Sequence, residues 1–308
     1  MVWEGEAVRL FPIPINGQMT RRFDVFAPLQ DFYWPGRHFS FSPSVALNRL
    51  EQSPDIRGLE KHVSKPEWNR ASTSGHWLMF QWIDGAEPSP STVVNLVLLS
   101  LWLVKPIRSQ VALKFEIGKD EAKDEATMSR LLDRFAWIPG TIDPDFTDED
   151  LKLAATYYAS LEKLALAKGR LNDAMVLTVA GCWSHGWQTA LICHAAAAET
   201  ILTYATGRGL TRRLGESYAC LVESDAHQRD VAFAEFISLY AARSDIVHGR
   251  MHRIARTDTL PTLLRFQNVM RRLWSVVLTS ANHVSALERD DAGREGYLIQ
   301  LQSGYVAP

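Results

Sequence analysis

The sequence predicts an α+β protein, in which a mixed, strand-containing N-terminal module precedes an all-α helical bundle. Three observations predict this order. Aromatic and turn-forming residues crowd residues 1–120, which is typical of short strands joined by tight connections. The stretch 121–146 is charged and turn-rich, as linkers are. Over 147–290 apolar residues recur at helical spacing, and 291–308 forms a polar, glycine-containing tail for which no element is predicted.

Two strands and a helix are expected in the N-terminal module, whose role the sequence does not assign. Residues 76–83 are rich in aromatic side chains, and residues 110–117 alternate apolar and polar ones. Between them, Ser91 is placed to cap an apolar helix over 92–103, which ends before Pro106. We expect the aromatic side chains to fill the core of the module. A surface that stacks bases or grips a protein is the alternative.

The second half of the chain is expected to be almost wholly helical. A short helix is expected over 127–137, and Thr147 followed by acidic residues is a helix-capping pattern. A break is expected near Gly181 or Gly186 within the second of the longer helices. These longer helices are predicted over residues 148–167, 171–206, 212–223, 227–249 and 260–288.

The composition is that of an ordinary globular protein. A net charge of −2 at pH 7 argues against a surface that binds nucleic acid indiscriminately. Three cysteines at these spacings do not form a disulfide pattern, which favours a reducing compartment. The first residues lack the basic start and apolar core of a signal peptide, and the longest apolar run, 93–104, is too short to span a bilayer. A cytoplasmic protein without a membrane partner is expected.

A zinc site is considered and set aside. Cys182, His185, Cys193 and His194 are residue types that bind zinc, but their separation matches no zinc finger or ribbon. We expect them to be core cysteines and interface histidines, and we predict no metal or other cofactor.

The most informative segment is RSDIVHG, residues 243–249. It places Arg243, His248 and Gly249 at the end of an otherwise apolar helix. On a straight helix Arg243 and His248 would diverge by roughly 140°, so they converge only if the helix ends there. Gly249 supplies such an ending as a C-cap. A guanidinium that grips phosphate beside an imidazole that moves a proton indicates phosphoryl transfer or phosphate binding.

Basic residues continue beyond this segment as far as Arg272. Two interpretations stay open: a solvated basic face, or contacts to the backbone of RNA. We assign RNA contacts to Arg250, Arg253, Arg271 and Arg272.

Glu199, on an alanine-rich helix, is expected to pair with Arg243 if the two helices pack together. Such a pair would orient the guanidinium. A buried ion pair that serves the architecture alone is the alternative.

From about Glu149 to Leu287 the chain resembles the HEPN superfamily, and within it the Apea-like branch. The resemblance runs through residues 170–175, 190–202 and 239–249, the last similar to the family's Arg-x4–6-His motif. It implies a helical bundle that dimerises with its two motifs facing each other. Many members are metal-independent RNases of toxin–antitoxin or phage-defence systems, whereas others only bind.

Two positions depart from the family pattern. Active members often carry Asn, Asp or His directly after the arginine, where this chain has Ser244, which neither carries charge nor titrates. Members controlled by a nucleotidyltransferase usually have a tyrosine two residues after the histidine, where this chain has Arg250. That mode of control is not expected here.

The resemblance and the motif together predict a metal-independent endoribonuclease of HEPN type, acting as a toxin or phage-defence effector. His248 would transfer the proton, Arg243 would stabilise charge on the phosphate, and Asp245 or Glu199 would hold these groups in place. RNA, a second copy of the chain, and an antitoxin or regulatory protein are the expected partners. The alternatives are a non-catalytic HEPN protein that binds RNA, a nucleotide or a protein, and a helical ligand sensor.

Overall fold

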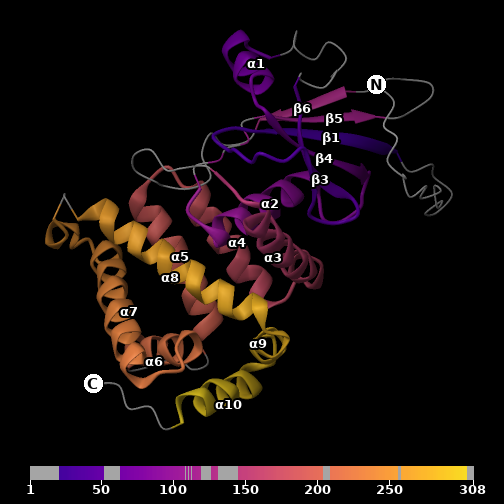
Figure 1. The fold of residues 1–308 in the computed structure, drawn as a ribbon. Coiled ribbons are helices and arrows are strands. Elements are labelled where there is room, and N and C mark those ends of the chain that lie inside the picture. Colours follow the sequence, from indigo (N-terminus) through magenta and orange to yellow (C-terminus); the bar gives the residue numbers. More distant parts are fainter. Residues whose placement is uncertain are drawn as a thin grey trace.

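The protein consists of an antiparallel sheet and a set of helices that pack against each other (Figure 1). This computed structural model describes residues 21–51, 63–107, 109, 111, 113–118, 126–130, 145–203, 209–255 and 258–303. The predicted α+β class, with a strand-containing N-terminal part and a helical C-terminal part, is confirmed.

The described strands form one six-stranded sheet with the order β2-β3-β4-β1-β5-β6, each strand antiparallel to its neighbours. The strands are β1 (Arg22–Leu29), β2 (His38–Ser40), β3 (Val45–Arg49), β4 (His76–Ile83), β5 (Leu113–Gly118) and β6 (Ala126–Arg130). The strand predicted over 76–83 is confirmed, and the one predicted over 110–117 corresponds to β5. The short helix predicted over 127–137 is wrong, because 126–130 pair with β5 as an edge strand; residues 131–137 lie outside the described residues.

Alternation along the strands gives the sheet two apolar faces. Val25 and Leu78 point into the large core shared with the helices. Trp77 and Phe115 point the other way, into a smaller cluster with Trp68 of α1 (Lys65–Ser72). The expectation that the aromatic side chains of this part fill its core is confirmed for these residues.

Helix α2 (Pro90–Val104) joins the sheet to the bundle (Figure 1). Residues 96–103 are all buried, so the middle of this helix has no solvent-facing side. It contacts α3 and α8. Its Trp102 stacks on the ring of His194 from α5, with an angle of 4° between the planes and 5.9 Å between the centroids. Sheet and bundle therefore share one hydrophobic core.

The cap of α2 differs from the prediction. Ser89, not Ser91, accepts the hydrogen bond from the backbone N–H of Thr92, and Pro90 occupies the first turn, where its missing N–H costs nothing. Ser91 instead accepts from the buried ammonium group of Lys114 at 3.0 Å.

The bundle contains more breaks than the sequence predicts. Its helices are α3 (Asp148–Ala167), α4 (Arg170–Trp183), α5 (Trp187–Leu202), α6 (Leu210–Val222), α7 (Ala226–Val247), α8 (Thr259–Thr279), α9 (Ala281–Leu287) and α10 (Asp291–Gln302). The predicted helix over 171–206 is broken before Gly186, which is one of the two positions where a break is expected. The predicted helix over 260–288 is also broken, at Ser280. Residues 291–302, for which no element is predicted, form α10.

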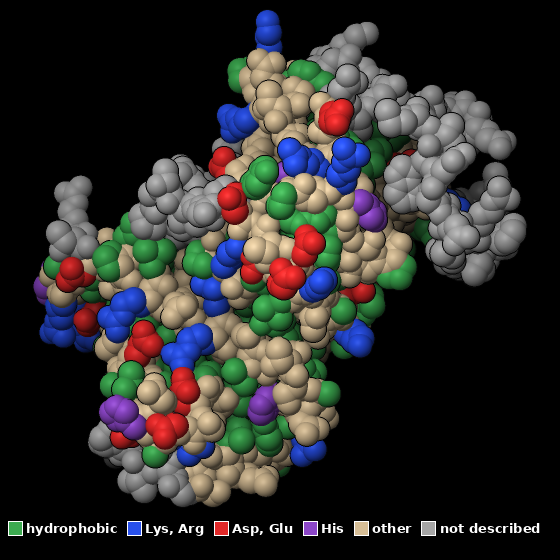
Figure 2. Space-filling view, in the orientation of Figure 1, with side chains coloured by type: hydrophobic (Ala, Val, Ile, Leu, Met, Phe, Trp, Pro, Cys, Tyr) green, Lys and Arg blue, Asp and Glu red, His purple; other side chains and the backbone are tan. Residues whose placement is uncertain are grey.

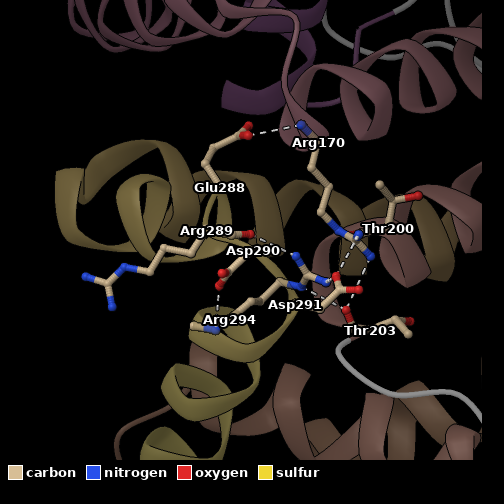
Figure 3. A network of polar contacts seen from close by, with 9 residues as sticks. Arg170, Thr200, Thr203, Glu288, Arg289, Asp290, Asp291 and Arg294 are labelled. Carbon is tan, nitrogen blue, oxygen red and sulfur yellow. Dashed lines mark hydrogen bonds and ion pairs between the residues drawn. The ribbon is translucent and has the colours of Figure 1, made fainter.

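A polar network fastens the last helices to the rest of the bundle (Figure 3). The carboxylate of Glu288 accepts from the backbone N–H groups of Arg170 and Leu171, at 3.0 and 2.7 Å, and so caps α4, whose own cap residue is a glycine. Arg294 of α10 and Arg170 both donate to the carbonyl of Thr203 at the end of α5. The network therefore satisfies backbone groups at two helix ends at once.

The sheet is also tied to the start of α3. Trp34 donates to the carboxylate of Asp148 at 2.7 Å, and the ammonium group of Lys105 pairs with Asp150 at 2.6 Å. Asp150 and Thr147 form the predicted capping box. A boundary at residue 120 would cut these contacts.

We expect the fragment 121–308 to lack a cooperative thermal transition, because removing α2 uncovers apolar faces of α3 and α8 to water. Circular dichroism melting of the fragment beside the full chain, with a dye that binds exposed apolar surface, measures this. A fragment that melts as sharply as the full chain and binds no dye would instead support two independent domains, as the boundary at 120 predicts.

Candidate functional site

The end of α7 is built as the sequence predicts. His248 is the C-cap, and Gly249 follows with φ +70°, the left-handed conformation that glycine adopts without strain. The N–H of Gly249 donates to the carbonyl of Ile246 at 3.1 Å, and that of Arg250 to the carbonyl of Asp245 at 2.7 Å. This pair of bonds is the Schellman motif. The predicted end of the helix at this glycine is thus confirmed, although the C-cap itself is His248 and Gly249 follows it in the turn.

Arg243 is held by a residue of α5 and a residue of its own helix. Its Nη2 lies 3.1 Å from the carboxylate of Glu199, so the predicted pair is present. Tyr240 donates to the same carboxylate at 2.6 Å, and the guanidinium lies over the Tyr240 ring, 5.4 Å from its centroid. Burial, together with the bond to Glu199, raises the pKa of Tyr240, which keeps its hydroxyl protonated as a donor.

These contacts leave the guanidinium half-buried and fixed in orientation. Arg243 and Glu199 keep about a quarter of their side-chain surface exposed, 28% and 26%. A ligand can therefore reach the pair from one side. Sequence reasoning did not assign a role to Tyr240, although its position three residues before Arg243 places both on one face of the helix.

His248 differs from Arg243 in being exposed. Within the part of the chain that the structure describes, its side chain makes no hydrogen bond or ion pair, and its backbone N–H donates to the carbonyl of Ser244 at 3.0 Å. Two apolar neighbours are exposed with it, Val247 (50%) and Met251 (40%).

Asp245 lies against two arginines that follow the turn. It accepts from Nε of Arg250 at 2.9 Å and lies 3.7 Å from Nη1 of Arg253. Nη2 of Arg250 also donates to the hydroxyl of Ser244 at 3.4 Å. Asp245 thus orients the segment after the helix, while Glu199 orients Arg243.

Arg271 and Arg272 lie elsewhere, on the middle of α8. Arg272 pairs with Glu223 and, at 3.7 Å, with Glu235 of α7. Glu235 precedes His248 by 13 residues, which is about 20 Å along a helix. Arg271 donates to the carbonyl of Val104, at the end of α2. The structure thus brings Arg243, Asp245, Arg250 and Arg253 to one end of α7 and places Arg271 and Arg272 apart from them.

The arginines do not form an unopposed basic face. Carboxylates from other helices and from α7 itself neutralise them: Glu199 for Arg243, Glu235 for Arg265, and Glu223 for Arg272. Figure 2 accordingly shows basic and acidic side chains interspersed on the face in view. Glu223 and Glu235 lie outside the basic segment of the sequence, and helix packing brings them to its arginines.

Cys182 lies in the core as expected, whereas His194, expected at an interface, lies in the core as well. Cys182 is fully buried, and burial raises the pKa of its thiol. His194 is fully buried as well, and burial lowers the pKa of its imidazole to about 4, so the ring is neutral in the core. Over the described residues, no group of three or more His, Cys, Asp or Glu side chains has the geometry to hold a metal ion.

Comparisons with models of known protein families, with curated proteins and with solved structures find no match to this chain. The resemblance to the HEPN superfamily therefore rests on the quoted residues and their order. Among the described helices, none combines the length and the apolar character needed to cross a membrane.

A double-mutant cycle tests the Glu199–Arg243 pair. We expect Glu199→Gln and Arg243→Met to be coupled by about 1 kcal/mol in the free energy of unfolding, the upper end for a partly exposed pair. Urea unfolding of the four proteins measures the coupling. The pair Arg212–Glu216, within one turn of α6 and more exposed at its arginine, is the matched control and should couple by about 0.3 kcal/mol. Equal coupling in the two cycles would contradict a special role for Glu199.

Proposed function

We propose that the protein is a metal-independent endoribonuclease of HEPN type. One observation carries the proposal: a guanidinium fixed by Glu199 and Tyr240 precedes an exposed imidazole by five residues, at a helix end closed by a Schellman motif. A fixed cation and a free proton carrier on one short segment are what cleavage of a phosphodiester requires. The resemblance of residues 239–249 to the family motif supports the same reading.

In the proposed reaction the ribose 2′-oxygen attacks the adjacent phosphorus. His248 takes the proton from the 2′-hydroxyl or gives one to the departing 5′-oxygen, and Arg243 stabilises the charge that develops on the phosphate. Glu199 is a positioning residue, because it holds Arg243. Asp245 positions Arg250 and Arg253, which contact the RNA backbone on either side.

A second copy of the chain completes this proposal. One imidazole cannot serve as base and acid in the same displacement, whereas a dimer with facing motifs supplies two. The exposed side chains of Val247 and Met251, beside His248, provide apolar surface for such a contact. As in the family it resembles, the enzyme would act as a toxin or phage-defence effector, with an antitoxin or regulatory protein as a further partner.

Specific observations also favour a second candidate, a protein that uses the same segment to bind RNA, a nucleotide or a protein without cleaving. The carboxylates of Glu199 and Asp245 already neutralise the arginines of the segment, which weakens their pull on phosphate. Ser244, which stands where active family members often carry a titratable side chain, contacts Arg250.

We expect His248→Ala to reduce cleavage of a labelled RNA in EDTA by about 10²- to 10⁴-fold, the usual contribution of a positioned acid or base. The melting temperature should change little, since the side chain is exposed. Arg243→Lys should reduce cleavage nearly as much, because lysine keeps the charge and loses the planar fork.

His252→Ala is the matched control, because His252 is also exposed and lies four residues further along; it should cleave as the wild type does. Unchanged cleavage by His248→Ala would refute the assigned role. A wild-type protein that binds RNA and leaves it intact would favour the non-catalytic candidate.

A further inference from the structure

A groove opens between four helices of the protein. It has a volume of about 380 Å³, at the lower end for pockets that hold small molecules. The end of α2, the start of α3, the end of α6 and the middle of α8 line it, and α8 contacts each of the other three helices. The groove thus spans the junction between the part of the chain that carries the sheet and the bundle.

Five of the eleven residues that line this groove are aliphatic, and the other six carry a charged group, an amide or a hydroxyl. Leu103, Leu153 and Val276 are among the aliphatic residues, and Leu153 keeps 40% of its surface exposed. Polar groups gather on one side. The hydroxyls of Tyr157 and Ser275 contact each other at 2.6 Å, and the amide of Asn268 lies one helical turn before Arg271.

Arg271 is a positively charged residue of the groove without a carboxylate partner among the described residues. Its Nη2 donates to the carbonyl of Val104 at 3.0 Å, while its Nε is buried without a hydrogen-bond partner. No carboxylate in the described part of the chain forms an ion pair with it, although its neighbour Arg272 has two. Burial accordingly lowers the pKa of this guanidinium. A half-buried cation without an anion is costly, and an anion bound beside it would remove that cost.

The surroundings select the kind of anion. The carboxylate of Glu223, held by Arg272 at the edge of the groove, repels a doubly charged phosphate more than a singly charged group. The aliphatic walls suit a hydrocarbon chain better than a base, for which Tyr157 offers the one aromatic ring among the lining residues.

We propose that this groove binds an aliphatic monocarboxylate, with its head group on Arg271 and its chain along Leu103, Leu153 and Val276. The hydroxyl of Ser275 and the amide of Asn268 are placed to donate to the same carboxylate. This site is separate from the end of α7, so the proposal does not depend on whether the protein cleaves RNA.

Calorimetric titration of the full chain with octanoate tests the site directly. We expect saturable binding by the wild type and at least about tenfold weaker binding of the uncharged analogue octanamide, because the charged hydrogen bonds to Arg271 are lost. Arg271→Met, which keeps most of the aliphatic stem, should lower the affinity for octanoate by a similar factor and leave that for octanamide unchanged.

Arg265→Met removes the same charge from α8 outside the groove and should bind octanoate as the wild type does. Leu153→Trp places a larger side chain in the groove at an exposed position and leaves Arg271 unchanged. It should abolish binding while the fold is retained. This variant keeps the test valid if Arg271→Met does not fold.

Equal binding of octanoate and octanamide, unchanged binding by Leu153→Trp, or no binding at millimolar octanoate would each overturn the proposal. Tighter binding of adenosine monophosphate than of octanoate would overturn the choice of a monocarboxylate.

Discussion

The burial of α2 on all sides is the constraint on which the structure depends. A helix whose residues 96–103 are all buried must be covered by the sheet on one side and by the bundle on the other. Two polar residues in the middle of this helix have hydrogen-bond partners: Asn95 accepts from the indole of Trp183 on α4, and Ser100 donates to a carbonyl of its own helix. The sheet is therefore part of the bundle's core. Helix α2 contacts α3, α5 and α8, and the last two of these contact α7.

The pairing of arginines with acids from neighbouring helices is the second organising feature. Glu199 orients Arg243, and Glu235 pairs with two arginines of α8. The segment has a strong excess of positive charge in the sequence, but in the fold carboxylates from neighbouring helices offset most of that charge. Charge alone therefore says little about where RNA would bind. His248, exposed at the end of α7, and Arg271, half-buried without an ion pair among the described residues, depart from this balance.

A helix or strand is predicted well where residues close together in the sequence are enough to determine it. The strand 76–83 and the start of α3 at Thr147 are predicted from an aromatic run and a capping pattern. The end of α7 follows from Gly249. In each case the decisive residues are adjacent in the chain.

Sequence alone does not predict the helices and strands whose stability depends on contacts with residues far away in the chain. Residues 126–130 follow an acidic run and become a strand because β5 offers an edge. Helix α10 contains two glycines, which disfavour a helix, but Leu298 and Arg294 are buried against the bundle and the network of Figure 3 holds its start. The neutralisation of Arg272 by Glu223 likewise joins residues 49 positions apart. The pair Glu199–Arg243 is the exception: it is predicted on the condition that the two helices pack together, and α5 and α7 do contact each other.

The central functional claim concerns the chemistry at Arg243 and His248, and the ends of the cleaved RNA test it most directly. Attack by the ribose 2′-oxygen leaves a 2′,3′-cyclic phosphate on one fragment and a 5′-hydroxyl on the other. Mass spectrometry of a defined RNA incubated with the wild-type protein in EDTA should find these ends, and the His248→Ala protein should not produce them. Intact RNA, or fragments that carry a 3′-hydroxyl and a 5′-phosphate, would contradict the account.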